Sequence, residues 1–92
     1  MKPAKRKGLV PAKNGEKIGV ADQESMKFFE LNEAYLNIWI MCDGKKSEDE
    51  ISKEFYDYLA KNSPKSKKIN REKIMLEAKG IIKRLMKFNL LE

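Results

Sequence analysis

The amino-acid sequence predicts a small α+β domain in which a three-stranded antiparallel sheet precedes three helices. An Asn14-Gly15 pair lies between two short apolar segments, a pattern that is typical of a β-hairpin. Three stretches with apolar residues at helical spacing follow, each after a residue suited to capping a helix. The chain has 92 residues, which is the size of one domain.

The predicted sheet occupies the first third of the chain. Segments 9–13 and 16–21 form the hairpin, and Pro11 places its first strand at an edge because proline has no N–H to donate. After a polar turn at 22–25, residues 26–31 form a third strand. Along it, Phe29 and Leu31 share one face, because side chains alternate between the two faces of a strand.

Asn32 is placed to cap the first predicted helix. A buried stripe on that helix is expected from spacings of three and four, at Tyr35, Ile38, Trp39 and Cys42. Asp43-Gly44 then ends it.

Ser47 and Glu50 form a capping box that opens a second helix, which the polar loop 62–68 ends. Asn70 caps a third helix that runs to about Phe88. Asn89 is expected in the left-handed conformation that commonly ends helices, with the residues after it folding back.

The segment 31–51, LNEAYLNIWIMCDGKKSEDEI, resembles the signature of the PqqD family. The most specific part is Leu31-Asn32 followed eleven residues later by Asp43-Gly44, and then a Ser cap before Ile51. The closing helix and the Leu90-Leu91 pair are also similar, so the likeness covers residues 26–92 well. Two departures are an Asn89 where the family usually has Gly and a long lysine-rich loop at 63–68.

The resemblance implies a winged-helix-like domain that recognises the leader segment of a ribosomally made precursor peptide. It also implies that the leader adds as a strand beside the third strand, over the third helix. Such domains present the peptide to a modifying enzyme, often of the radical S-adenosylmethionine type. We therefore expect a PqqD-like peptide-recognition domain at 9–92, behind a flexible basic tail at 1–8 that has nothing to bury.

The composition argues against catalysis. The chain has no His and a single Cys, which removes Ser-His and Cys-His nucleophile pairs and the common zinc sites. The acidic run 48–50 stands at a helix start, where capping explains it. We therefore expect no enzymatic activity, no cofactor and no metal.

No apolar run approaches the roughly 20 residues that a membrane span needs. No apolar signal segment follows the basic start of the chain, so we expect no membrane contact and a cytoplasmic location. The net charge of +6 is uneven, because both ends are basic and the middle is acidic. This pattern favours an anionic partner.

The candidate peptide site combines the third strand with one flank of the third helix. That helix has more apolar side chains than one packed face requires, and methionine suits an adaptable groove. Two lysines at the rim of the flank would attract acidic residues of the peptide. The alternative is that the flank packs inside a three-helix core. The predicted site residues are Met26, Lys27, Phe28, Phe29, Glu30, Leu31, Met75, Lys79, Ile82, Lys83 and Met86.

A winged-helix DNA-binding protein is the alternative function. The basic ends and the helix trio favour it. Against it, a wing would follow the recognition helix, and the candidate face has Met and Ile where base reading needs Arg, Asn or Gln. Nucleic acid is thus the less favoured partner.

Overall fold

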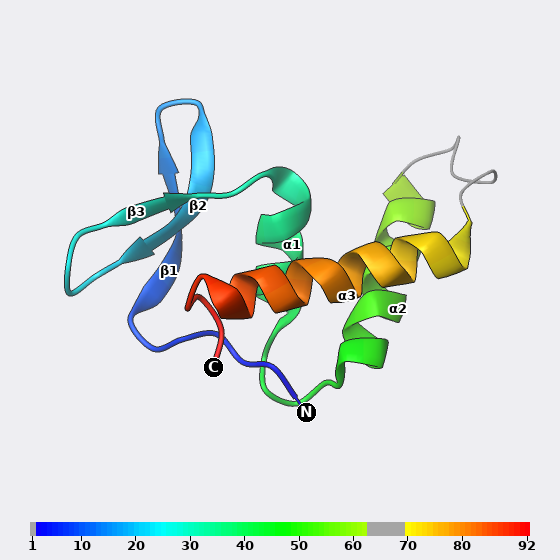
Figure 1. Ribbon diagram of the computed structural model, residues 1–92. Coiled ribbons are helices and arrows are strands. Elements are labelled where there is room, and N and C mark those ends of the chain that lie inside the picture. The colour runs from blue at the N-terminus through cyan, green and yellow to red at the C-terminus, as the bar shows by residue number, and fades with distance from the viewer. Residues whose placement is uncertain (1, 63–69) are drawn as a thin grey trace.

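The computed structural model describes residues 2–62 and 70–92. An antiparallel sheet in the order β1 (Leu9–Asn14), β2 (Lys17–Asp22), β3 (Phe28–Glu30) comes first. The helices α1 (Glu33–Met41), α2 (Glu48–Asn62) and α3 (Arg71–Lys87) follow. Figure 1 shows the sheet at one end of the molecule, with α3 crossing the helical part and ending beside the sheet. The predicted order and class are confirmed, and most of the predicted loop at 62–68 lies outside the described residues.

The hairpin forms as predicted, but its turn lies one residue later than expected. Asn14 pairs with Lys17, so Gly15 and Glu16 form the turn, and Gly15 has a φ of 66°. A two-residue turn with glycine in its first position requires this positive φ. Pro11 lies in β1 at the edge of the sheet, as predicted.

The third strand is shorter than the predicted 26–31. Only Phe28–Glu30 is strand, and Met26 has a φ of 62°, which takes it out of the extended conformation and into the turn before β3. β3 also approaches β2 very closely at Gly19. A Cβ at that position would lie 1.9 Å from the carbonyl oxygen of Phe29, so only glycine fits there.

The predicted caps are confirmed. Asn32 Oδ1 accepts from the N–H of Tyr35 at 2.9 Å. Ser47 and Glu50 make both hydrogen bonds of the capping box, each at 3.2 Å. Asn70 caps α3 by accepting from two backbone N–H groups.

The end of α3 also folds as predicted. Asn89 has a φ of 64°, and the N–H of Leu90 donates to the carbonyl oxygen of Leu85 at 2.9 Å. This turn sends Leu90 and Leu91 back into the core, where both are buried.

The core lies where the helices meet the inner face of the sheet. Trp39 is fully buried at its centre, together with Ile38 and Cys42 of the predicted stripe. Other fully or almost fully buried side chains come from β2, α2, α3 and the chain end, and include Val20, Ile51, Ile82, Leu85 and Leu90. Tyr35, the fourth member of the stripe, is only half-buried. It packs at the edge of the core and lines a surface hollow instead.

The expectation that residues 1–8 have nothing to bury is wrong for the segment that begins at Pro3. Pro3 is buried, and its carbonyl oxygen accepts from the N–H of Gly44 at 2.9 Å. Ala4 and Glu92 exchange two backbone hydrogen bonds, at 3.0 and 2.8 Å. The segment forms these contacts because the folded-back end of the chain offers main-chain groups to pair with.

Candidate functional site

The outer edge of β3 is open to a partner strand. In the described part of the chain, β3 pairs with β2 on one side, and no strand lies on the other. The N–H of Leu31 donates to the carbonyl oxygen of Ile18 in β2 at 2.9 Å. Phe29, two residues earlier and opposite Val20, also turns its main-chain groups toward β2. Because main-chain groups alternate in direction along an antiparallel strand, those of Phe28 and Glu30 point away from β2. An added strand would meet these N–H and C=O groups.

A hollow of about 580 Å³ lies beside this edge, which is within the size range of small-ligand sites. It is mostly apolar and opens between β3, the start of α1 and the end of the chain. Phe88, just past the end of α3, forms part of its wall and is 57% exposed, a large value for an aromatic ring. The lining residues are Phe28, Phe29, Glu30, Leu31, Asn32, Tyr35, Phe88 and Leu90.

A second hollow of about 560 Å³ lies between the start of α1 and the middle of α3. It shares Asn32 and Tyr35 with the first hollow, so the two adjoin. Gly80 has no side chain to fill this hollow, and a Cβ at its position would point into open space with no atom within 4 Å. Its other lining residues are Ala34, Lys73, Leu76, Glu77, Ile81 and Arg84.

The side chains of Arg84 and Tyr35 meet at the junction of the two hollows. Arg84 Nη1 donates to the hydroxyl oxygen of Tyr35 at 2.6 Å, which connects α3 to α1. This hydrogen bond holds the pKa of Arg84 above its usual value, so the guanidinium remains charged at every relevant pH.

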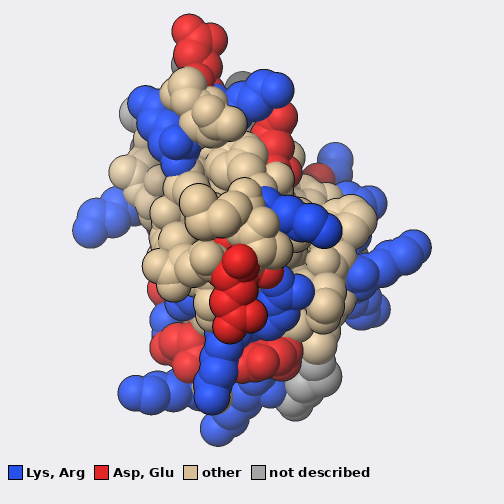
Figure 2. Space-filling view, turned by 90° about the vertical axis from the view of Figure 1, so that its left-hand side faces the viewer, with Lys and Arg blue, Asp and Glu red and all other residues tan. Residues whose placement is uncertain are grey.

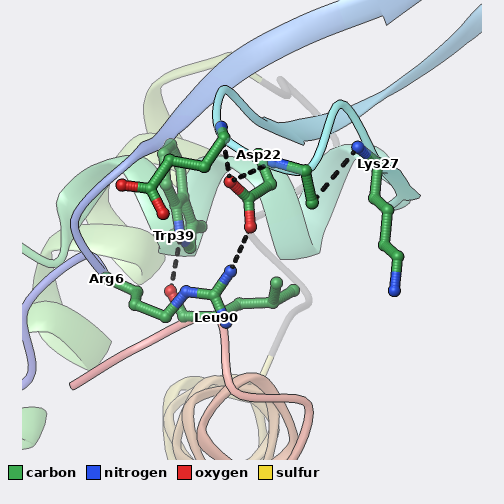
Figure 3. Close-up of polar contacts among 7 residues, drawn as sticks. Arg6, Asp22, Lys27, Trp39 and Leu90 are labelled. Atoms are coloured by element: carbon green, nitrogen blue, oxygen red, sulfur yellow. Dashed lines mark hydrogen bonds and ion pairs between the residues drawn. The ribbon is translucent and has the colours of Figure 1, made fainter.

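Asp22 organises the turn that leads into β3. Its carboxylate accepts from the N–H groups of Glu24 and Ser25, at 2.9 and 3.3 Å, and from Arg6 at 2.9 Å (Figure 3). The two backbone donors, Glu24 first, are the main reason that the pKa of Asp22 lies below its usual value of 3.8, and the charge of Arg6 adds to the effect. The turn is thereby fixed from both its own backbone and the N-terminal segment.

The charge around the site is mixed. Figure 2 views the molecule from the side of the sheet and shows mostly uncharged surface in its upper middle, with Asp and Glu at the centre and below it and many Lys and Arg side chains projecting at the rim. Glu30 on β3 lies 3.9 Å from Lys17, and both side chains are largely exposed. An exposed pair of this kind contributes little to stability and could exchange partners with a bound chain.

The structure brings together the strand half of the predicted site. Phe28, Phe29, Glu30 and Leu31 all line the first hollow. Lys27 and Met26 precede them in the turn, and Met26 is 84% exposed.

None of the α3 residues in the prediction lines the first hollow with β3. Ile82 is fully buried in the core, and Met86 is half-buried against it. Lys79 forms an ion pair with Asp49 of α2, and it lines, together with Met75, a smaller hollow that shares Leu76 with the second hollow. Lys83 is exposed and lines neither the first nor the second hollow.

Sequence reasoning missed the α3 residues that line the two hollows, four of which are Leu76, Gly80, Arg84 and Phe88. They recur every four residues and therefore share one side of the helix. A Gly inside an otherwise strong helix, with exposed Leu and Phe in the same row, was the available signal.

Cys42 offers no chemistry to the site. Its side chain is buried and donates to the carbonyl oxygen of Ile38 at 3.2 Å. Burial raises the pKa of the thiol to about 11, so it is protonated at neutral pH. The prediction that Cys42 and Trp39 are core residues is confirmed.

Within residues 2–62 and 70–92, no group of three or more Cys, Asp or Glu side chains is arranged to hold a metal ion. No helix in the same residues is both long and apolar enough to cross a membrane.

Comparison with known proteins finds similarity in structure alone. No protein-family model matches the chain, and no curated protein matches it either. Among solved structures, "TbiB1 in Complex with the TbiA(beta) Leader Peptide" has a TM-score of 0.64 at 16% identity, over 97% of this chain and 94% of that one. "Lasso peptide synthetase B1 complexed with the leader peptide" has a TM-score of 0.68 at 12% identity, over 100% and 99%. The chain therefore has the fold of these two proteins over nearly its whole length.

Proposed function

We propose that this protein is a non-catalytic module that recognises the leader segment of a ribosomally made precursor peptide. The observation that carries the proposal is the open outer edge of β3 beside an apolar hollow. An edge strand binds an extended peptide through main-chain hydrogen bonds, and the hollow selects side chains of that peptide. The module then presents the peptide to a modifying enzyme, for example of the radical S-adenosylmethionine type, in the cytoplasm.

Two further observations support the proposal. Both structural neighbours were solved with a leader peptide bound, as their names state. The Leu31-Asn32 and Asp43-Gly44 signature independently resembles the PqqD family, whose members bind leader peptides. Neither neighbour supports the alternative of a DNA-binding protein.

The geometry suggests how the peptide is held. Its main chain pairs with Phe28 and Glu30, whose N–H and C=O groups point outward. Every second side chain of the peptide then lies on the same face as Phe29 and Leu31 and can enter the first hollow. Phe88 covers the far side of that hollow, so we propose it as the α3 contact in place of the flank around Met75 and Met86.

Amide shift mapping tests the proposal. The protein, labelled with ¹⁵N, is titrated with synthetic leader peptides from the short reading frames beside its gene. We expect saturable shifts at residues 28–31, 84 and 88. If no such peptide binds, the proposed function is wrong. If the shifts cluster at Met75, Lys79 and Lys83 instead, the function stands and the placement is wrong.

Two alanine variants form a matched test of the groove. Phe88→Ala removes an exposed ring from the wall of the hollow, and we expect it to weaken leader binding by about tenfold or more, because buried aromatic contacts dominate peptide affinity. Met86→Ala changes a half-buried residue that packs against the core and lines neither hollow, and we expect little loss of affinity beyond its effect on stability. Equal losses in both variants would contradict this placement of the groove.

A further inference from the structure

Arg84 is a charged group without an acidic partner. Four ion pairs occur within the described residues, and none of them involves Arg84. Glu77 lines the same hollow without pairing with it. The guanidinium instead donates to the neutral hydroxyl of Tyr35. A charged donor binds a carboxylate more strongly than a phenol, so Arg84 has a weaker partner than its chemistry allows.

The position of Arg84 places a guanidinium that could bind a carboxylate next to the proposed groove. Arg84 lines the second hollow, and Phe88, one helical turn later, lines the first. Tyr35 lines both hollows, so the Arg84–Tyr35 hydrogen bond lies where they meet. A peptide side chain that extends beyond the first hollow would reach this bond first.

We propose that the second hollow is a subsite for an acidic residue of the bound peptide. On binding, Arg84 gives up its hydrogen bond to Tyr35 and donates to the carboxylate of that residue instead. This inference rests on the proposed function and names the class of peptide that the site selects. The peptide carries a large apolar residue for the first hollow and an Asp or Glu for the second. Side chains on one face of a strand are spaced by two residues, so the two determinants stand at least two positions apart.

The charged residues around the second hollow determine where in it a peptide carboxylate would bind. Lys73 and Glu77 also line the second hollow, on the side of α3 toward its start. Glu77 would repel a second carboxylate there, whereas Arg84 attracts one at the end next to Tyr35. The acidic residue is therefore read close to the junction. Since Arg84 is exposed, water and salt weaken the pair, and we expect a preference of about three- to tenfold for the acidic peptide.

A displayed library of random 12-residue peptides tests the inference without knowledge of the natural leader. The 92-residue protein selects from the library in parallel with three variants, Arg84→Gln, Tyr35→Phe and Lys83→Gln. Selected peptides that compete for the β3 edge are identified by amide shifts at residues 28–31. Circular dichroism melts confirm that each variant is folded.

The expected result has three parts. The parent enriches an apolar residue together with Asp or Glu, and Arg84→Gln keeps the apolar residue and loses the acidic preference. Lys83→Gln, which removes a neighbouring exposed charge that lines neither hollow, selects as the parent does. Tyr35→Phe strengthens the acidic preference, because it removes the acceptor that competes for Arg84. A purely structural role for the Arg84–Tyr35 bond would not produce that gain.

Two results would overturn the inference and leave the proposed function intact. One is an apolar motif in the parent with no acidic preference, and the other is an acidic preference that Arg84→Gln retains. If no peptide that binds at β3 is enriched by the parent, both the inference and the proposed function are wrong.

Discussion

The indole N–H of Trp39 donates a hydrogen bond of 3.0 Å to the carbonyl oxygen of Leu90, a residue 51 positions later in the chain (Figure 3). Both partners are buried. The bond fixes the folded-back end of the chain to the last turn of α1, and so holds the wall of the first hollow to which Leu90 belongs.

Replacing Trp39 with Phe tests how much this hydrogen bond contributes to the free energy of unfolding. The variant loses the donor and part of the ring volume, and we expect the free energy of unfolding to fall by about 2–3 kcal/mol. Urea denaturation at pH 7 measures it. Tyr58→Phe, at a partly exposed ring, is the control and should change little. A Trp39→Phe value within about 0.5 kcal/mol of the parent would show that the bond contributes nothing measurable.

Asp22 should make stability depend on pH in the acid range. Its pKa is lowered in the folded protein, chiefly by the N–H groups of Glu24 and Ser25, so the folded state favours the carboxylate. The resulting stabilisation is complete above the unfolded pKa and is lost as the pH falls through the lower folded value. We expect the parent to exceed Asp22→Asn in stability at pH 7 and the difference to shrink below about pH 4. Urea midpoints from pH 7 to 2.5 give the comparison, and a constant difference would contradict it.

Ser47 should contribute about 1 kcal/mol to stability as the cap of α2. Its hydroxyl accepts from the N–H of Glu50, and the Glu50 side chain accepts from the N–H of Ser47. Ser47→Ala removes the first of these bonds, whereas Ser47→Asp keeps an acceptor at the helix start. Thermal denaturation followed at 222 nm compares the two. A pair of variants that melt together would show that the cap is unimportant.

Met26 offers a way to separate stability from binding. Its φ of 62° is unfavourable for any residue with a Cβ, and its side chain is 84% exposed, so it contributes little packing. Met26→Gly should therefore leave stability unchanged or raise it by about 0.5–1 kcal/mol, after the extra freedom of glycine in the unfolded chain is counted.

The same variant should bind the leader less well if the Met26 side chain contacts the peptide. Isothermal titration with the leader identified by shift mapping measures this, with Lys27→Ala as the neighbouring control. Loss of stability in Met26→Gly would show that the side chain packs in solution.

Local signals were enough to predict the order of the elements. The caps at Asn32, Ser47 and Asn70 and the left-handed Asn89 depend on hydrogen bonds within a few residues, and all are confirmed. The length of β3 was overestimated because the extended appearance of 26–31 gave no sign that Met26 adopts a positive φ.

The α3 half of the site could not be predicted in the same way. Apolar character alone did not distinguish the row that packs in the core from the row that lines the two hollows. Ile82 belongs to the first, while Gly80, Arg84 and Phe88 belong to the second. Which row lines the hollows depends on how α3 is rotated against α1, a tertiary relationship without a local signal. The burial of Pro3 was missed for the same reason, since its partners lie at Gly44 and the chain end.

The pairing of Ala4 with Glu92 determines how the domain would respond to a mechanical load. The two short segments run antiparallel, with the N–H of Arg6 bonded to the carbonyl oxygen of Leu90 further inward, so both chain ends leave the pair on the same side (Figure 1). A force that separates the two ends would therefore load these hydrogen bonds one at a time, as in opening a zipper, rather than all together. The first event under tension should be a low-force release of residues 3–6, after which the Trp39–Leu90 bond carries the load.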